Sequence, residues 1–539
     1  MKIRHITKYV GALSIVLFTT SGCEKYLDVN TNPNTPDKAA GRNILPVMLD
    51  AMELSATEDA DFSIAQYIQF TGIPLSGSGT ERHTGTVGAS DGGGFVWRQH
   101  YWGIGINIDL IIADGVTKNN PLQTGIAKAI RAWSWQMLAD VYGETIVKQA
   151  WESGRSTFAY DTQEEAYNEA AKWAKMAIAD LNKATPANLA DIASGDATYQ
   201  GDAIKWRKFA YGVLAINANN ISAKVGKYKS DDVIRYCDSS FTSNADNFMI
   251  RNDASTSLFA NSMGPGYSGA NVSGMRATSY VVGILDGTDG RKTGVRDPRL
   301  SIMIPATVSG KYRGVVSTLG DEITRTTDPF TTYTDIRETQ KLDWIPPLRG
   351  MKAARTDLKE PGFWIFKDEA SFPLMTYAEI QFIKAEAAFI KNDKSVAWDS
   401  YKKGIDASML FTGVTATNSA AYMNSAAVAS MTNLKISDIM MEKYIALFGH
   451  GYINTWTDLR KYAYGKKDNA YPGFILPDER SNTTGTGIVG YATDNLGKPA
   501  QRIRPRYNSE IVYNFAELER IGGTSLQYHT KPMWFASPN

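Results

Sequence analysis

Few residues of this sequence have the types and spacing that enzymatic chemistry requires. Gly88, Ser90 and Gly92 form a G-x-S-x-G pattern. A serine nucleophile in that pattern needs an apolar strand before it and a helix directly after it, and the glycine-rich segment around Ser90 offers neither. Glu379 and Glu386 share one face of an expected helix, where they suit a capping role and a structural role respectively. We therefore predict no catalytic residues and expect that the protein is not an enzyme.

Metal-binding patterns are equally weak. The histidines are scattered along the chain without an H-E-x-x-H motif or a pair of neighbouring cysteines. Asp28, Asn30 and Asn32 imitate the beginning of a calcium loop. Pro33, however, stands where that loop requires glycine, and Ala39 stands where it requires glutamate. We predict no metal site and no cofactor from these residues.

Aromatic side chains on glycine-rich loops are better candidates, and they indicate binding. A flat ring stacks on the apolar face of a sugar, while Asn, Asp, Arg or Gln side chains bind the hydroxyls. For any single ring, burial in the core is the ordinary interpretation. Taken from the glycine-rich loop at 71–94, its exit and the later loops, the candidate ligand-binding residues are Arg82, His83, Trp97, Tyr267, Tyr280, Trp344 and Trp364. The aromatic rings would stack on the ligand, and Arg82 would bind hydroxyls or a carboxylate.

The elements that must position these residues are mainly helices. Apolar residues recur with helical spacing, and short breaks separate the periodic segments. These segments are 42–70, 95–114, 126–142, 162–181 and 203–225. The helical period is lost in 239–369, where glycines accumulate, so loops and a few short strands are predicted there. Regular structure resumes at Thr376, which forms a capping-box pattern with Glu379.

An apolar stripe follows near the C-terminal end of the periodic region. It consists of Met440, Tyr444, Phe448, Tyr452, Trp456, Leu459 and Ala463. The spacing predicts one wrapping helix, or two helices that are joined near Gly449 and Gly451, because glycine is unfavourable inside a helix. Four charged residues fall off the stripe and are expected on a solvated or paired surface. They are Glu442, Asp458, Arg460 and Lys461.

The N-terminus has the features of a secretion signal. Lys2, Arg4 and Lys8 precede a short apolar run that ends in Ser-Gly-Cys23. The run is too short to span a bilayer core of about 30 Å. Its ending resembles a bacterial lipoprotein signal, in which Cys23 becomes the lipidated first residue. A plain cleaved signal is the alternative. We expect a signal peptide at 1–22, a lipidated N-terminus and tether at 23–40, and a single domain at 41–539.

The charge balance restricts the possible partners, and the cysteine content restricts how the fold is stabilised. Without residues 1–22 the chain has 54 basic and 56 acidic residues. A protein that tracks phosphates needs a net basic surface, so we predict no nucleic-acid partner. If Cys23 carries lipid, Cys237 has no cysteine partner, and the fold cannot depend on an internal disulfide. No later stretch is apolar for long enough to span a membrane.

Several segments resemble the SusD/RagB-like proteins, which are surface glycan- and nutrient-binding lipoproteins of Bacteroidetes. Near the N-terminus the similar string is LDVNTNPN. The segment 375–387 carries a second similarity, and the A-L-F-G helix followed by Trp456, Asp458 and Arg460 carries a third. The segment 501–514 is similar to the closing segment of these proteins. The matches therefore extend over nearly the whole chain.

This resemblance implies a mainly α, SusD-like fold with tetratricopeptide-like helix pairs and an irregular, loop-rich half with few short strands. It also implies a palmitate-type lipid anchor at Cys23 and a place on the outer face of the outer membrane. The implied function is to bind oligosaccharides and deliver them to a SusC-like TonB-dependent transporter. The ligand-binding residues of the family form no fixed motif, so none is assigned by position. A peptide- or protein-binding member of the family and a surface glycoside hydrolase are the alternatives.

Overall fold

The computed structural model describes most of the chain after residue 38. The described residues are 39–74, 79–85, 93–255, 260–268, 275–288, 294–321, 343–350, 362–481, 488–505 and 507–538. The chain separates into two units, Met1–Ala40 and Gly41–Asn539. The expected signal peptide, Cys23, most of the tether and Ser90 lie outside the described residues. Among the helices of the described ranges, none combines the length and the apolarity needed to cross a bilayer.

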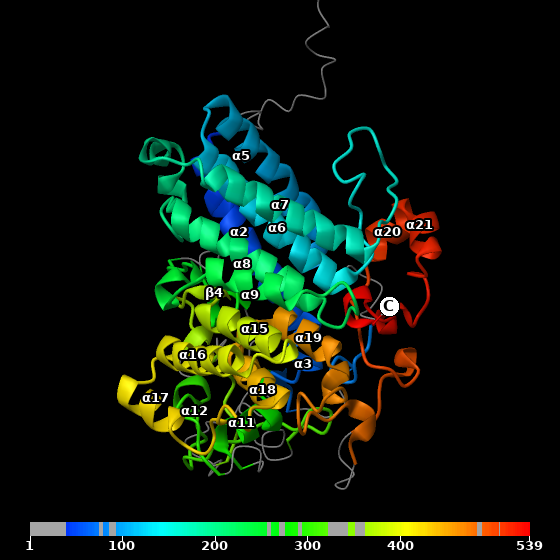
Figure 1. The fold of residues 1–539 in the computed structure, drawn as a ribbon. Coiled ribbons are helices and arrows are strands. Elements are labelled where there is room, and N and C mark those ends of the chain that lie inside the picture. Colours follow the sequence, from blue (N-terminus) through cyan, green and yellow to red (C-terminus); the bar gives the residue numbers. More distant parts are fainter. Residues whose placement is uncertain are drawn as a thin grey trace, which may run out of the picture. The chain divides into compact units, whose positions relative to one another are not determined.

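Long helices pack side by side in chain order and form the main layer of the second unit (Figure 1). Each contacts the next, and the layer runs through α5 (Gly105–Thr117), α6 (Pro121–Tyr142), α7 (Gln163–Leu181), α8 (Ala203–Asn220), α9 (Ser230–Ser239), α15 (Tyr377–Ile390) and α16 (Lys394–Thr412). The predicted layer of helix pairs is therefore confirmed. Shorter helices flank it, namely α17 (Ala416–Met423), α20 (Tyr507–Tyr513) and α21 (Phe515–Arg520).

Local capping explains where several of these helices begin. Asn120 accepts a hydrogen bond from the backbone N–H of Gln123 at the beginning of α6. Thr162 and Glu165 form a complete capping box at α7. At α15, Thr376 accepts from the N–H of Glu379, but the Glu379 side chain accepts from Asn454 instead of closing the box. The predicted capping box is thus only half formed.

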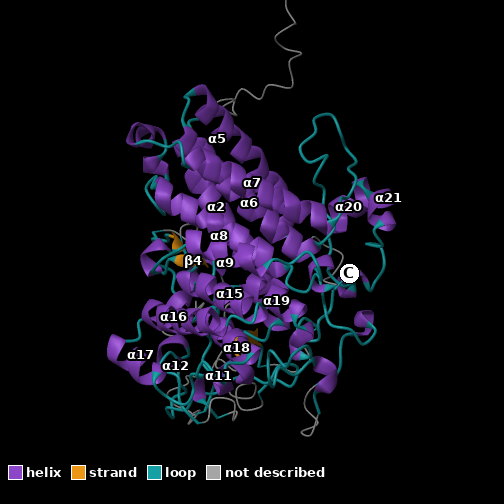
Figure 2. Ribbon diagram, viewed as in Figure 1, coloured by secondary structure: helices purple, strands orange, loops and turns teal. Residues whose placement is uncertain are grey.

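Two small antiparallel sheets each pair a strand of the irregular segment with a strand outside it (Figure 2). In one, β1 (Thr71–Gly72) pairs with β3 (Arg276–Ala277), and in the other, β2 (Phe248–Ile250) pairs with β4 (Phe372–Met375). The short helices of this part are α10 (Pro265–Ser268), α11 (Ser279–Asp286) and α12 (Leu300–Met303). The prediction of loops and few short strands is confirmed, although α11 is a regular two-turn helix that the sequence pattern did not indicate.

The apolar stripe forms two helices, α18 (Ile436–Ala446) and α19 (Tyr452–Lys461), joined through Gly449. All stripe residues except Ala463 are buried. Gly449 has φ +83°, and a Cβ at this position would lie 3.1 Å from Ile365 Cγ2. Of the two alternatives, the jointed helix pair is confirmed, and glycine is required both by the backbone conformation and by the close neighbour.

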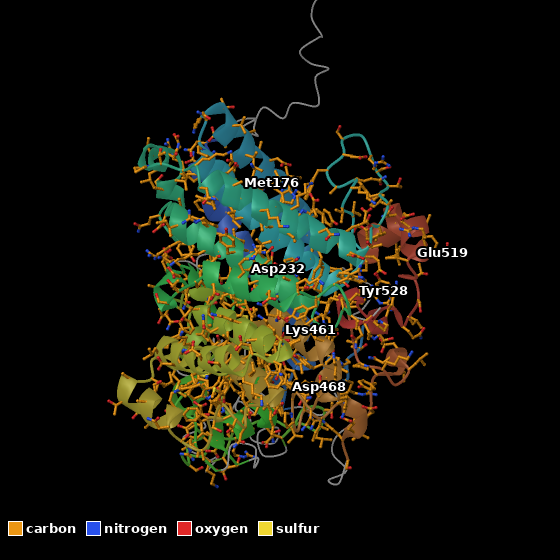
Figure 3. The ribbon with its side chains drawn as sticks, viewed as in Figure 1. Met176, Asp232, Lys461, Asp468, Glu519 and Tyr528 are labelled. Carbon is orange, nitrogen blue, oxygen red and sulfur yellow. The ribbon has the colours of Figure 1, made fainter. Side chains whose placement is uncertain are left out.

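The charged residues beside the stripe are paired, but they are buried rather than on a surface. Lys443 Nζ lies 2.8 Å from one carboxylate oxygen of Asp458, and Lys461 Nζ lies 3.1 Å from the other. Lys461 also lies 2.8 Å from Glu386 Oε1 on α15 (Lys461 is labelled in Figure 3). Burial opposes ionisation of Asp458, yet the two lysines outweigh it and lower its pKa. We call these four residues the buried ion network.

A second buried ion pair connects the irregular segment to α18. The guanidinium of Arg299 lies 2.6 Å from Glu442 Oε2 and 2.7 Å from Asp297 Oδ2. The three side chains are at most 2% exposed. Arg460, the remaining charged residue, lies 3.9 Å from the centroid of the Trp456 ring. The expectation of a solvated face was wrong because distant segments cover these charges.

Replacing Lys461 by methionine tests the buried ion network. The Lys461→Met variant leaves Glu386 buried without its cation and removes one of the two lysines at Asp458. We expect the free energy of unfolding, measured by urea denaturation, to fall by about 3–5 kcal/mol. As a control, Lys172→Met removes an exposed pair with Glu169 and is expected to cost less than about 1 kcal/mol. Equal effects of the two substitutions would contradict the network's structural role.

Candidate functional site

Two π-helical turns interrupt the first helices of the second unit. The chain leaves α2 (Gly41–Asp59) through a π turn at Ala60–Ile64 and continues as α3 (Ala65–Tyr67). A second π turn, Gln99–Ile104, separates α4 (Phe95–Arg98) from α5. The helices predicted at 42–70 and 95–114 are therefore present, but each is locally widened. Such turns are frequent at functional sites. The surface beside these two turns is therefore a candidate functional site.

Asp59 connects the two π-turn regions. Its carboxylate is fully buried and accepts hydrogen bonds from the backbone N–H groups of Phe95, at 3.1 Å, and Val96, at 2.8 Å. The Tyr142 hydroxyl donates a third bond at 3.2 Å. Burial raises the pKa of Asp59 to about 6, although these bonds oppose the shift. Asp59 thereby fixes the beginning of α4 against the end of α2, and with it the position of Arg98.

Beside Asp59, four side chains form a partly exposed surface that we call the Glu58–Trp102 surface. The Tyr267 hydroxyl donates to Glu58 Oε1 at 3.1 Å. Arg98 interacts electrostatically with Glu58, and its guanidinium carbon lies 5.1 Å from the centroid of the Trp102 ring. Trp102 itself is 61% exposed. An exposed indole beside a carboxyl, a phenol and a guanidinium can stack on a sugar and bind its hydroxyls.

The carboxyl of Glu58 has an unusual protonation equilibrium. Partial burial raises its pKa to about 7, and the nearby carboxylates of Asp59 and Asp50 add to the shift. The hydrogen bond from Tyr267 and the charge of Arg98 act in the opposite direction. Near neutral pH, Glu58 is thus present in both forms, so it can accept a hydrogen bond from a ligand hydroxyl or donate one.

The position of Tyr267 depends on Asp368. The backbone N–H of Gly266 donates to Asp368 Oδ1 at 2.6 Å. A Cβ on Gly266 would lie 2.8 Å from the same carboxylate, so the close approach requires glycine at this position. The backbone N–H of Asn261 donates to the Asp368 carbonyl at 2.8 Å. The segment around Asp368 therefore holds α10, which carries Tyr267, against the end of α2.

Three of the predicted aromatic residues are buried. Trp97, Tyr280 and Trp344 are 5%, 6% and 4% exposed. The Trp97 ring lies 4.9 Å from that of Tyr101, and the Trp344 ring lies 5.3 Å from the guanidinium carbon of Arg276. Their faces contact the protein interior, so in this structure they pack the core and present no free ring face to a ligand.

Arg82 and His83 are held by the C-terminal part of the chain. Arg82 donates to the carbonyls of Gly490, at 3.0 Å, and Tyr491, at 2.7 Å. His83 is buried, and its Nδ1 accepts a hydrogen bond from the N–H of Ala500 at 3.2 Å. Burial lowers the pKa of His83 to about 3, so the ring is neutral. Both side chains fasten the described part of the glycine-rich loop.

Three predicted residues, Tyr267, Trp364 and Arg82, remain partly exposed. Tyr267 belongs to the Glu58–Trp102 surface, whereas Trp364 lies at the α18–α19 joint, near Gly449. Glu58, Arg98 and Trp102 were not predicted. A signal for Trp102 did exist, because it falls outside the helical spacing of the apolar residues in 95–114, which are Trp97, Tyr101, Ile104, Ile108 and Ile111. A tryptophan that lies off the buried stripe of its helix is a candidate for the surface.

A metal centre has no support in the part of the chain that the structure describes. No group of three or more His, Cys, Asp or Glu side chains is arranged to hold an ion there. Cys237 is a free, buried cysteine. The Glu58–Trp102 surface thus resembles a binding surface made of a ring, a cation and hydrogen-bonding groups.

Comparison with known proteins identifies the family. Residues 33–474 match the SusD-like family model, which is described as "Starch-binding associating with outer membrane". The chain belongs to the SusD-like family. No curated protein matches this SusD-like chain.

Solved structures share the fold. A SusD/RagB family protein from Bacteroides thetaiotaomicron aligns with a TM-score of 0.66 and 20% identity, covering 93% of this chain and 100% of that chain. A chitin-binding SusD homolog from Flavobacterium johnsoniae aligns over the same shares with a TM-score of 0.67 and 17% identity. For a SusD homolog from Bacteroides uniformis the values are 0.67 and 18%, again with 93% and 100% coverage. The mainly α, SusD-like fold expected from the sequence is confirmed.

The pKa of Glu58 can be tested by carbon-detected NMR titration of its carboxyl group. We expect a midpoint near 7, and a higher midpoint in Tyr267→Phe, because that substitution removes a hydrogen bond that lowers the pKa. The unfolded chain loses this proton near the ordinary glutamate pKa of 4.5, whereas the folded protein retains it to a higher pH, so the free energy of unfolding should decrease as pH rises from about 4.5 to 7. A midpoint near 4.5 in the wild type would contradict the described environment of Glu58.

Proposed function

We propose that this SusD-like protein binds oligosaccharides at the cell surface through the Glu58–Trp102 surface and delivers them to a partner TonB-dependent outer-membrane transporter. The observation that carries the proposal is an indole that is 61% exposed beside Arg98, whose charge in turn acts on the hydrogen-bonded pair of Glu58 and Tyr267. The starch-binding description of the family and the chitin-binding homolog support a glycan as the ligand class.

The chemistry of the surface suits a neutral or weakly charged glycan. The Trp102 ring would stack on the apolar face of a sugar, and Arg98 would donate to hydroxyl or acetamido oxygens. Glu58 would bind a hydroxyl in either protonation state, while Tyr267 holds the carboxyl in place. The partly exposed Trp364 and Arg82 are further candidates at the edges of a longer ligand, whereas the buried rings would act through packing.

The protein is proposed to be anchored by lipid at Cys23 on the outer face of the outer membrane. The Ser-Gly-Cys23 ending of the apolar leader and the charged residues after it support this proposal. Residues 23–40 would form the tether, and an extended chain of that length reaches up to about 60 Å. Such a tether would allow the binding surface to face a transporter in the same membrane.

The protein is proposed to act without breaking bonds. A glycoside hydrolase would need two facing carboxyl groups roughly 5–10 Å apart at the ligand. Glu58 accepts from Tyr267 and adjoins Arg98, and the carboxylate of the neighbouring Asp59 is buried and bonded to the backbone of α4, an arrangement suited to holding a hydroxyl. Family members in the solved structures include a protein that is named for binding chitin.

Replacing Trp102 by alanine tests the binding surface. Isothermal titration of the protein lacking residues 1–23 against a panel of glycans and peptides, with parallel cleavage assays, should show saturable glycan binding without cleavage. We expect Trp102→Ala to weaken that binding about tenfold or more, because the stacking face is lost. Tyr513→Ala is the control, since Tyr513 is 67% exposed on α20 and lies outside the surface.

Other outcomes would overturn the proposal in different ways. Binding of peptides alone would reassign the protein as a peptide-binding member of the family. Cleavage that depends on the protein would show a surface enzyme. If Trp102→Ala and Tyr513→Ala reduce glycan affinity equally, the binding site does not lie at the Glu58–Trp102 surface.

Lipidation can be tested separately by replacing Cys23. In a Bacteroidetes host, labelled palmitate should be incorporated into the wild-type protein and the protein should fractionate with the outer membrane. The Cys23→Ala variant should lose both properties, because the thiol is the only group at this position that the lipid could modify. If the Cys23→Ala variant carries no labelled palmitate but still fractionates with the outer membrane, the proposed lipid anchor is disproved.

A further inference from the structure

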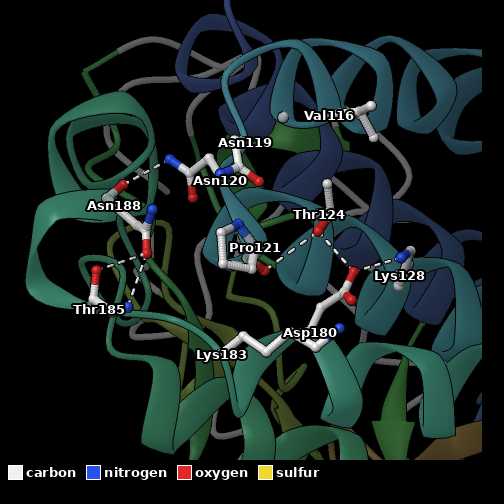
Figure 4. Close-up of a pocket in the computed structure, with 11 residues that line it drawn as sticks. Val116, Asn119, Asn120, Pro121, Thr124, Lys128, Asp180, Lys183, Thr185 and Asn188 are labelled. Carbon is white, nitrogen blue, oxygen red and sulfur yellow. Dashed lines mark hydrogen bonds and ion pairs between the residues drawn. The ribbon is translucent and has the colours of Figure 1, made fainter.

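A concave site lies at the opposite end of α5 from Trp102. The hollow has a volume of about 590 Å³, which is typical of small-molecule sites. It lies among the ends of α5 and α7, the beginning of α6 and the turn Pro186–Asp191 (Figure 4). Because α5 has 13 residues, roughly 20 Å of helix separates the two sites. A ligand in this hollow would therefore not touch the Glu58–Trp102 surface.

The walls of the hollow are held by hydrogen bonds among the protein's own groups. Asn120 is 2% exposed; its side-chain oxygen accepts from the N–H of Gln123 at 3.0 Å, and its nitrogen donates to the Asn188 carbonyl at 2.9 Å. Pro121 begins α6 with a fixed backbone conformation. Because these contacts join the protein's own groups, they hold the walls in place, and binding would require little ordering of the walls.

One acidic side chain lines the hollow, and it is already neutralised. Asp180 forms an ion pair with Lys128, and its Oδ2 accepts from the Thr124 hydroxyl at 2.7 Å. Lys183 also lines the hollow, and no ion pair or side-chain hydrogen bond of its ammonium occurs among the described residues. The lining thus has one ammonium that is not matched by an acidic group, and it favours a ligand with a single negative charge.

Further groups in the hollow suit hydroxyls. The Asn188 side-chain oxygen accepts from the backbone N–H of Thr185 at 2.8 Å, so the NH₂ group of this amide can donate to a ligand (Figure 4). Asn119 adds a second amide. On the opposite side, Val116 is 68% exposed and offers an apolar wall. Amides, one ammonium and an apolar wall together match a sugar ring that carries a carboxylate.

We propose that this hollow is a second binding site, and that it binds a saccharide bearing one carboxylate, of the uronic-acid type. A phosphate or sulfate cluster is a poorer match, because recognition of such groups usually employs several cations or an arginine fork, and the lining has one ammonium without an acidic partner. The site does not depend on the proposed function of the Glu58–Trp102 surface, since the two share no residue.

The test uses a short galacturonate oligosaccharide as the probe and the neutral galactose oligosaccharide of equal length as the control ligand. Titrations are made with the protein that carries Trp102→Ala, so that the Glu58–Trp102 surface does not contribute. We expect saturable binding of the acidic probe, at least about fivefold tighter than that of the neutral one. Lys183→Gln should remove this preference.

Lys175→Gln is the matched control variant, because Lys175 is an exposed lysine of α7, the helix that ends just before Lys183, and it does not line the hollow. It should leave the binding of the acidic probe unchanged. The proposal is overturned if the acidic probe does not bind, if the neutral oligosaccharide binds equally well, or if Lys183→Gln and Lys175→Gln have the same effect. Circular dichroism of each variant verifies that the fold is retained.

Discussion

The structure depends on the buried ion network more than on any single apolar contact. Asp458 lies between Lys443 and Lys461, and Lys461 also binds Glu386, so α15, α18 and α19 are connected through charges that have no access to water. Removing charges from water is costly, and only complete pairing offsets this cost. The arrangement therefore permits one relative position of the three helices. The same arrangement fixes the joint at Gly449. This glycine lies next to Ile365, in the segment that precedes Asp368.

Two series of contacts hold the Glu58–Trp102 surface in place. The first series begins at the Gly449 joint, which lies next to Ile365. The same segment continues to Asp368, which holds α10 and Tyr267. The other begins at Asp59, whose carboxylate fixes the beginning of α4 and thus the arginine and tryptophan that follow. The two meet where Tyr267 donates to the side chain that precedes Asp59. A rigid platform of this kind presents an exposed ring with little loss of conformational entropy on binding.

The sequence predicted the helices well because periodicity and capping are local properties. The segments 126–142 and 162–181 lie almost wholly within α6 and α7. Burial of Lys461 could not be predicted, because its partner Glu386 lies 75 positions away in the chain. Exposure of a ring was partly predictable. Trp97 and Trp102 are five positions apart, which places them on different sides of a regular helix, and one is 5% exposed and the other 61%.

Crystallography of the protein lacking residues 1–23, with a bound oligosaccharide selected by its affinity, tests the central claim most directly. Our account expects a sugar ring within about 4 Å of the exposed face of Trp102. Its hydroxyl or acetamido groups should lie within hydrogen-bonding distance of Glu58 or Arg98. A ligand that occupies another surface and leaves Trp102 uncovered would contradict the account.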